Sequence, residues 1–190
     1  MTWTSRPMAA AIGVALLSGG VPARAEDPAL ERWTTDAAVE DASPIRFRGG
    51  FSGSVGSLLH DDFALGIGGF EGRLGVQLTD PFAVYVQPYF GMYWGDINGR
   101  DGNSLMGGAS ALVDYTFGER AFAAGGIGVA RFDEPIGATL HLRGGGYPLV
   151  GHGQDGIRRL GLMVAGELRL FVVSETVVVS PTVSVGFEAF

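Results

Sequence analysis

Charged and titratable side chains recur at alternate positions within apolar segments of this 190-residue sequence. Residues two apart point to the same face of a β-strand, so the members of each pair would share a face. The set consists of Glu71, Arg73, Asp114, His141, Arg143, Glu167 and Arg169. These side chains could form a polar site, a gated ion pore, or a plug of paired charges. A buried charge without a partner is costly, so we predict the plug.

Nucleophilic catalysis would need a serine and an acid that converge on one of three histidines. His60 and His152 fall in predicted loops, and His141 has an arginine as its nearest neighbour on the same face. The sequence has no compact His-Ser pair on a strand near its end. We therefore predict no catalytic residues, and a lipid-modifying enzyme remains an alternative.

Two other motifs could bind ions or cofactors. The stretch from Asp96 resembles a calcium loop, but Arg100 and Gly107 stand where an EF-hand needs ligands. The glycine runs at 66–69 and 144–146 lack the Gly-Lys-Ser/Thr that follows in a phosphate-binding loop. The sequence also has no cysteine. We predict neither a metal site nor a cofactor.

The elements that must position the charged set are β-strands, because apolarity alternates with a period of two from Ile45 onward. The clearest segment is Phe82 to Trp94, in which every even position is apolar and the odd positions are small, amide or phenolic. Thirteen such residues would extend about 43 Å at about 3.3 Å each. That is long for a strand of a soluble protein.

Turn signals divide the region 45–190 into about eight strands, the first near 46–55. The breaks fall at 79–81, 95–103, 118–120, 133–137, 151–156 and 174–176. The longest of them, Gly95 to Asn103, is polar and is predicted to be a loop that could contact a partner. No helical period is evident after residue 45, so the predicted class is all-β.

The composition indicates which face of these strands meets lipid. The non-apolar face is rich in Gly, Ala, Ser and Tyr, as a narrow lumen requires. Aromatic residues gather at segment ends, as the interface girdles of a membrane barrel would. The predicted interface aromatics are Phe82, Tyr93, Trp94, Phe117, Phe122 and Phe190. We therefore predict a closed, antiparallel, up-and-down transmembrane β-barrel, because a strand-built span must pair all its backbone groups.

The N-terminus has the three-part layout of a secretory signal peptide. Arg6 precedes the apolar run Met8 to Leu17, and the small-x-small triplet 23–25 predicts cleavage after Ala25. Residues 26–44 hold six acids and are predicted to be a linker or short periplasmic segment. The net charge of −7 argues against a nucleic-acid partner.

Taken together, the leader at 1–25, the alternating strands over 45–190, the short turns and the terminal Phe190 resemble the small eight-stranded outer-membrane barrels of the opacity-protein and OmpA-barrel type. The resemblance implies an outer-membrane location, a monomer in contact with outer-membrane lipid, and a C-terminal strand read by the outer-membrane insertion machinery. In that family the alternate positions before the last Phe are apolar, whereas here they are Glu188, Gly186 and Ser184. Either a bulge resets the register near Glu188, or Phe190 points inward.

The function we predict is that of a non-catalytic barrel with a structural or surface-interaction role and a lumen filled by side chains. Three alternatives stay open at this point. They are a lipid-modifying enzyme in the same membrane, a narrow ion pore, and a soluble periplasmic barrel that binds an apolar ligand. The last would have the opposite facing, with Phe82, Val84, Val86 and Phe90 around a cavity and Tyr85 and Gln87 in water.

Overall fold

A computed structural model describes residues 45–97, 100–118, 120–132, 136–153, 159–173 and 176–190. The predicted signal peptide and the acidic segment 26–44 lie outside these described residues. Among the described residues, no helix is long and apolar enough to cross a membrane.

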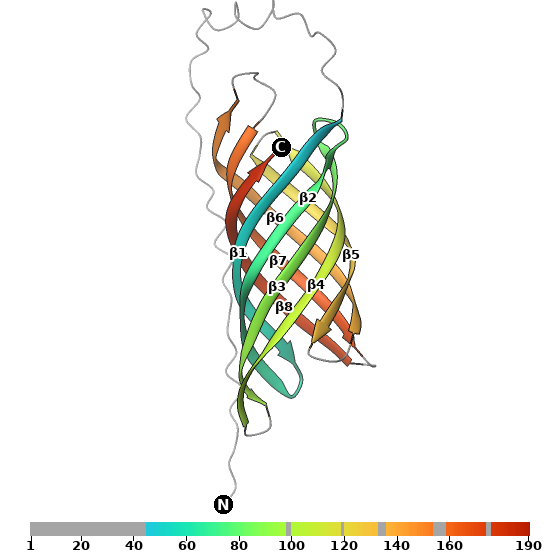
Figure 1. Cartoon of the computed structure of the whole chain (residues 1–190), viewed down its shortest axis with the longest axis vertical. Helices are drawn as coiled ribbons and strands as arrows, with labels where there is room; N and C mark the ends of the chain where they lie inside the picture. Colours follow the sequence, from blue (N-terminus) through green and yellow to red (C-terminus); the bar gives the residue numbers. More distant parts are fainter. Residues whose placement is uncertain (1–44, 98–99, 119, 133–135, 154–158, 174–175) are drawn as a thin grey trace, which may run out of the picture. The chain divides into compact units, whose positions relative to one another are not determined.

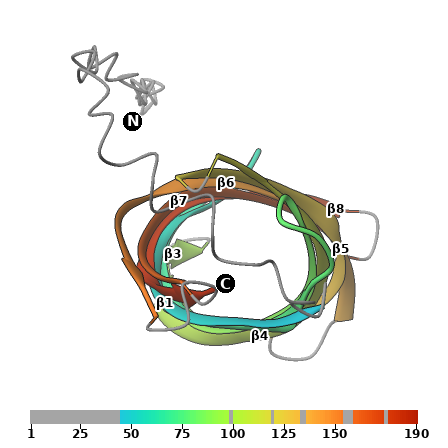
Figure 2. The same ribbon diagram turned by 90° about the horizontal axis from the view of Figure 1, so that it is seen from above.

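Eight antiparallel strands make up the described fold, as the sequence predicts (Figure 1). They are β1 (Arg46–His60), β2 (Phe63–Gln77), β3 (Phe82–Ile97), β4 (Arg100–Phe117), β5 (Ala121–Phe132), β6 (Ile136–His152), β7 (Arg159–Val173) and β8 (Thr176–Ala189). Each strand pairs with the next along the chain, and β1 pairs with β8, so the sheet closes on itself. Viewed from above, the strands form a ring, and the C-terminus lies inside it (Figure 2).

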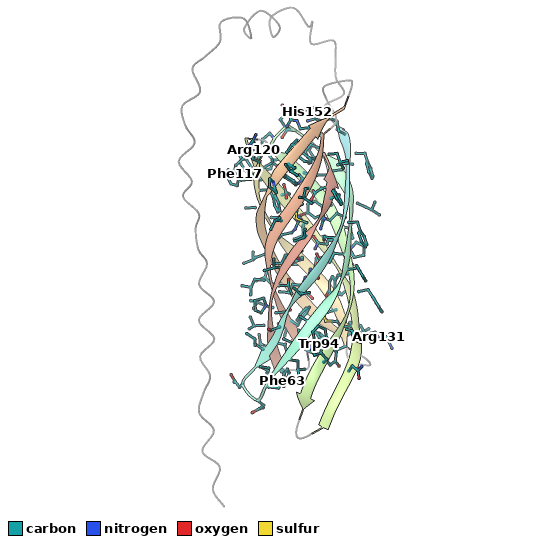
Figure 3. The ribbon with its side chains drawn as sticks, turned by 90° about the vertical axis from the view of Figure 1, so that its left-hand side faces the viewer. Phe63, Trp94, Phe117, Arg120, Arg131 and His152 are labelled. Atoms are coloured by element: carbon teal, nitrogen blue, oxygen red, sulfur yellow. The ribbon has the colours of Figure 1, made fainter. Side chains whose placement is uncertain are left out.

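The two ends of the barrel differ in what they carry. One end, called the terminal end, contains the start of β1, the end of β8 and the links β2–β3, β4–β5 and β6–β7. The opposite end, called the distal end, contains the other four links. Figure 3 shows Phe117, Arg120 and His152 at the terminal end, and Phe63, Trp94 and Arg131 at the distal end. The hairpin of β3 and β4 extends beyond its neighbours at the distal end (Figures 1 and 3).

Strand boundaries differ from the prediction at several places. The predicted loop 95–103 is wrong, because β3 and β4 stay paired through Gly95↔Gly102 and Ile97↔Arg100. The first strand runs to His60 rather than 55, and β6 runs to His152, one residue past the start of the predicted break. In each case the backbone hydrogen bonds between two strands continue from apolar residues into polar or glycine-rich residues. They can do so because the backbones of both strands still offer donors and acceptors there.

Alternation along every strand separates an apolar outer wall from a polar interior. On β3, Phe82, Val84, Val86 and Phe90 are exposed on the outer wall, whereas the Gln87 side chain is fully buried. Large apolar side chains on all eight strands are exposed in the same way. The barrel is thus apolar outside and polar inside, the reverse of a water-soluble protein.

Candidate functional site

The seven charged or titratable residues singled out from the sequence all point into the barrel and are buried. The lumen also contains Arg48 from β1 and Glu188 from β8, both fully buried. Its buried charges are therefore four arginines and four carboxylates, with His141 beside them. The arginines are Arg48, Arg73, Arg143 and Arg169, and the carboxylates are Glu71, Asp114, Glu167 and Glu188.

Glu167 on β7 is the centre of the network in the middle of the lumen. Its carboxylate accepts hydrogen bonds from Arg143 Nε (3.2 Å) and Ser184 Oγ (2.9 Å), and it is also ion-paired with Arg169. His141 Nε2 lies 3.0 Å from Glu167 Oε2. Arg169 in turn donates to Glu71 at 2.6 Å. These bonds join β2, β6, β7 and β8 across the interior, so the charges pair as a plug requires.

A second group of charges lies toward the terminal end and is centred on Arg48. Its guanidinium donates to Glu188 Oε1 (2.6 Å), to Asp114 Oδ1 (2.9 Å) and to the Tyr147 hydroxyl (2.9 Å). Arg73 Nε lies 3.2 Å from Glu188 Oε2. Arg48 therefore has two carboxylate partners from strands on different sides of the barrel, β4 and β8.

Apolar side chains close the lumen on both sides of these charges. The distal cluster contains Leu58, Leu65, Ile67, Tyr89, Met106, Ala130, Phe171 and Val178. The terminal cluster contains Phe122, Tyr147, Met163, Ala165 and Phe190. Beside the Glu71–Arg169 pair, a hollow has a volume of only about 10 Å³, space for about one water molecule. At this level of the lumen the interior is filled by side chains, as expected of an eight-stranded barrel.

The predicted interface aromatics divide into two groups. Phe82, Trp94 and Phe117 are exposed on the outer wall near the ends of their strands. The prediction is wrong for Phe122 and Phe190, which are only 3% and 7% exposed and lie inside the lumen. Tyr93 also points inward, where it packs against the distal cluster.

These three aromatics follow the inner phase of their strands, and this phase explains the difference. Tyr93 shares its face with Tyr85 and Gln87, and Phe122 shares its face with Ala124. Phe190 shares its face with Glu188, so of the two possibilities left by the sequence, the chain end points inward.

The histidines do not converge with a nucleophile at the outer wall. His141 is fully buried against Glu167 in the lumen. His60 ends β1, where its ring stacks on Phe63 and its Nδ1 accepts from the Asp62 backbone N–H. His152 ends β6 and is exposed. Within the part of the chain that the structure describes, no group of three potential ligand residues could hold a metal ion.

Several lumen residues were missing from the predicted set, and alternation could have found most of them. The inner face of β2 contains Gln77 together with Arg73. The inner face of β3 contains Gln87 together with Tyr85. Glu188 shares its phase with Ser184 and Thr182. Arg48 gives less signal, because the glycines that follow it hide the period.

The solved structures most relevant to this geometry are small outer-membrane barrels of eight strands. Neisserial surface protein A matches with a TM-score of 0.53 and 11% identity, over 76% of this chain and 97% of its own. Ail, the attachment invasion locus protein of Yersinia pestis, solved with the heparin analogue sucrose octasulfate, matches with a TM-score of 0.51 and 11% identity, over 75% and 97%. A scan against protein-family models and a search of curated proteins find no match. At this identity the resemblance concerns the fold, and it agrees with the eight-stranded architecture described above.

Proposed function

We propose that this chain is an integral outer-membrane β-barrel with a filled lumen and a structural or surface-interaction role. The observation that carries the proposal is the inverted distribution of side chains. Apolar groups cover the outer wall, and the eight buried guanidinium and carboxyl side chains point inward. Such a continuous apolar surface is far larger than a soluble monomer exposes. Lipid is the surrounding that matches it, because closed barrels can span a bilayer with every backbone group paired.

The soluble alternative required the opposite facing. Phe82, Val84, Val86 and Phe90 would line a cavity in that case, but they lie on the outer wall. Tyr85 and Gln87 would be in water, but both are buried. The structure therefore contradicts the soluble lipid-binding barrel.

A lipid-modifying enzyme would need a catalytic histidine at the wall that faces lipid. The buried His141–Glu167 pair lies in the lumen, beneath side chains that fill it. The proposal is therefore a barrel without a catalytic role.

The first test is fractionation followed by a gel with boiled and unboiled samples. We expect the protein in the outer-membrane fraction, with faster or slower migration before boiling than after, because a closed barrel resists detergent until it is heated. Protein in the soluble periplasmic fraction without a shift would contradict the proposal. A soluble control protein with a cleaved signal peptide would show that the periplasmic fraction is clean.

The proposal includes the outer-membrane insertion machinery as a partner of the last strand. On β8, the outward row is Val183, Val185 and Phe187, each more than half exposed, whereas Phe190 is buried. A partner that meets the strand from outside would therefore contact Phe187 rather than the Phe190 ring. Phe187→Ala should reduce the inserted fraction in cells more than Phe190→Ala does, with purified folded protein as the stability control. A greater loss of insertion for Phe190→Ala, at equal stability, would place the recognised ring at the chain end.

A surface-interaction role would use the distal end. The strand ends and links there fall within 60–62, 96–101, 131–135 and 173–176, and these sequences contain seven acids and two arginines. A polyanion of the kind bound to Ail is therefore disfavoured by charge. We expect no retention of this protein on immobilised heparin at physiological salt. Retention that falls as salt rises would contradict this expectation.

A further inference from the structure

The last strand places one acidic side chain in the lumen, and three arginines meet on it. Glu188 Oε1 accepts a hydrogen bond from Arg48 Nε at 2.6 Å. Its Oε2 lies 3.2 Å from Arg73 Nε and 3.5 Å from Arg143 Nη2. The arginines belong to β1, β2 and β6, whereas the backbone of β8 pairs only with β7 and β1. Glu188 thus links β8 to two strands, β2 and β6, that its backbone does not reach.

The three arginines depend on Glu188 to different degrees. Arg48 also pairs with Asp114 at 2.9 Å, and Arg143 also pairs with Glu167 at 3.2 Å. For Arg73, Glu188 is the only carboxylate in ion-pair distance among the residues that the structure describes. Arg73 is almost fully buried, and its remaining side-chain bond runs to the Ser52 hydroxyl. Without Glu188, a buried guanidinium would lack its counter-charge.

The charge balance of the whole lumen also depends on Glu188. Strands β1 to β7 contribute all four arginines but only three carboxylates, Glu71, Asp114 and Glu167. The fourth carboxylate comes with β8. With each guanidinium and carboxyl group counted as charged, the two signs balance only when the last strand is in place, and excess charge in a low-dielectric interior is unfavourable.

The seam that β8 closes has an interrupted backbone ladder. The pairing of β1 with β8 runs from Gly49↔Ala189 to Gly56↔Thr182 and resumes only at Leu59↔Val179. Pro181 lies in the gap, and proline has no N–H to donate to a ladder. Next to the continuous part of the seam, the Phe190 ring stacks on Tyr147 of β6 at 4.5 Å. Side-chain contacts inside the lumen therefore stabilise the terminal end of the seam between β1 and β8.

We propose that Glu188 is a clasp that couples closure of the barrel to neutralisation of the lumen. The arginines of β1, β2 and β6 attract the Glu188 carboxylate of β8. Arg73 is the arginine that depends on Glu188 for its counter-charge. The clasp rests on closure of the strand ring and does not depend on which membrane holds the barrel.

The absence of cysteine allows closure to be measured directly. Val55 and Val183 are directly paired across the seam, and both point outward, so cysteines at these positions lie within disulfide reach. Val86 and Ala111, paired between β3 and β4, provide the matched control pair. Each pair would be introduced into the full chain, purified in detergent, and the disulfide yield followed over time after mild oxidation.

In the parent, both pairs should cross-link. Glu188→Gln should slow the seam cross-link at least about tenfold relative to the control pair, because a buried charge loses its partner. Adding Arg73→Gln should restore the seam, since the interior is neutral again. Asp61→Asn, in an exposed turn, should change neither pair.

The double variant also decides the case in which Glu188→Gln alone does not fold. Recovery through loss of the Arg73 charge is expected of a clasp, and it is not expected if Glu188 only fills space. Seam cross-linking at the parent rate in Glu188→Gln would overturn the proposal. A double variant that closes no better than Glu188→Gln would also overturn it.

Discussion

At the scale of single residues, the high glycine content has a steric cause in the lumen wall. A Cβ built on Gly126 of β5 would lie 1.8 Å from the carbonyl oxygen of Ala111 on β4. A Cβ on Gly186 of β8 would lie 2.0 Å from the carbonyl oxygen of Phe51 on β1. No side chain fits where a neighbouring backbone approaches this closely, so glycine lets the narrow barrel curve.

This steric argument predicts the effect of a single methyl group. Gly126→Ala should lower the free energy of unfolding by about 1–3 kcal/mol, since the backbones of β4 and β5 must separate. Gly166→Ala is the matched control, because nothing lies within 4 Å of its added Cβ, and it should stay within about 0.5 kcal/mol. Urea unfolding in detergent would measure both. Equal effects of the two substitutions would contradict a steric role for Gly126.

The lumen ion pairs predict that a buried and an exposed acidic residue contribute differently to the free energy of unfolding. Glu167→Gln should cost about 3–5 kcal/mol, because Arg143 and Arg169 would lose a buried partner. Asp62→Asn changes an exposed carboxylate that lies 3.7 Å from His60 Nδ1, and exposed charges of this kind contribute about 0–1 kcal/mol. The same unfolding experiment distinguishes them. A Glu167→Gln variant as stable as Asp62→Asn would mean that the network does not hold the strands together.

At the scale of the strand, turn signals indicated about eight strands, with ten as an alternative, and alternation was sufficient for the all-β class and the direction of the charged set. The alternation repeats every second residue, and one misjudged position does not change it. The ends of strands were less predictable. Gly95 and Asn103 read as loop residues, but their backbones pair because the hairpin continues past the apolar part of β3 and β4.

Aromatic residues near strand ends were misassigned for a related reason. Proximity to a turn predicted an interface position for Tyr93, Phe122 and Phe190, but strand phase decided their direction. Phase was available from the sequence and would have given the observed result. The contacts between distant strands, such as Arg48 with Asp114, were not available, because a single sequence does not fix which inner residues meet across a lumen.

The strand β3 offers a depth test of its outer face. Val86→Arg should destabilise the barrel in a bilayer by about 2–4 kcal/mol if it lies near the midplane, and Phe82→Arg at the strand end should cost about 0–1 kcal/mol. Both residues are exposed on the outer wall, so neither change disturbs the lumen. Folding into lipid vesicles, followed by the gel shift, would measure the difference. Equal costs would mean that the outer wall of β3 does not span an apolar slab.

At the scale of the whole molecule, the buried guanidinium and carboxyl groups of the lumen are balanced in number. Four guanidiniums meet four carboxylates, and apolar clusters lie on both sides of them. A narrow pore would need a continuous wet path past both clusters. We therefore expect the interior to hold the strands together and not to conduct ions.

Conductance measurements test this expectation. In planar bilayers, the parent protein should give no single-channel steps. Neutralising Glu71, Arg73, Glu167 and Arg169 together should also give none, because the apolar clusters remain. A steady conductance in the parent that changes with these substitutions would instead identify the charged network as the lining of an ion pore.

The even number of strands places the start of β1 and the end of β8 at one end of the barrel, and the predicted export of the chain would decide which side that end faces. A chain that crosses the inner membrane reaches the outer membrane from the periplasm, so the terminal end should stay there and the distal links should cross. Cysteines introduced as Asp61→Cys in the turn between β1 and β2 and Arg120→Cys in the turn between β4 and β5 would report on the two ends. Figure 3 labels Arg120 at the terminal end and Phe63, which follows the first turn, at the distal end. Both positions are exposed, and the chain has no cysteine of its own.

In intact cells, a membrane-impermeant thiol reagent should label the Asp61→Cys variant and reach the Arg120→Cys variant only after the outer membrane is opened. Labelling of the Arg120→Cys variant alone would reverse the orientation and place the acidic distal links in the periplasm. Labelling of both variants in intact cells would mean that the barrel does not separate two compartments.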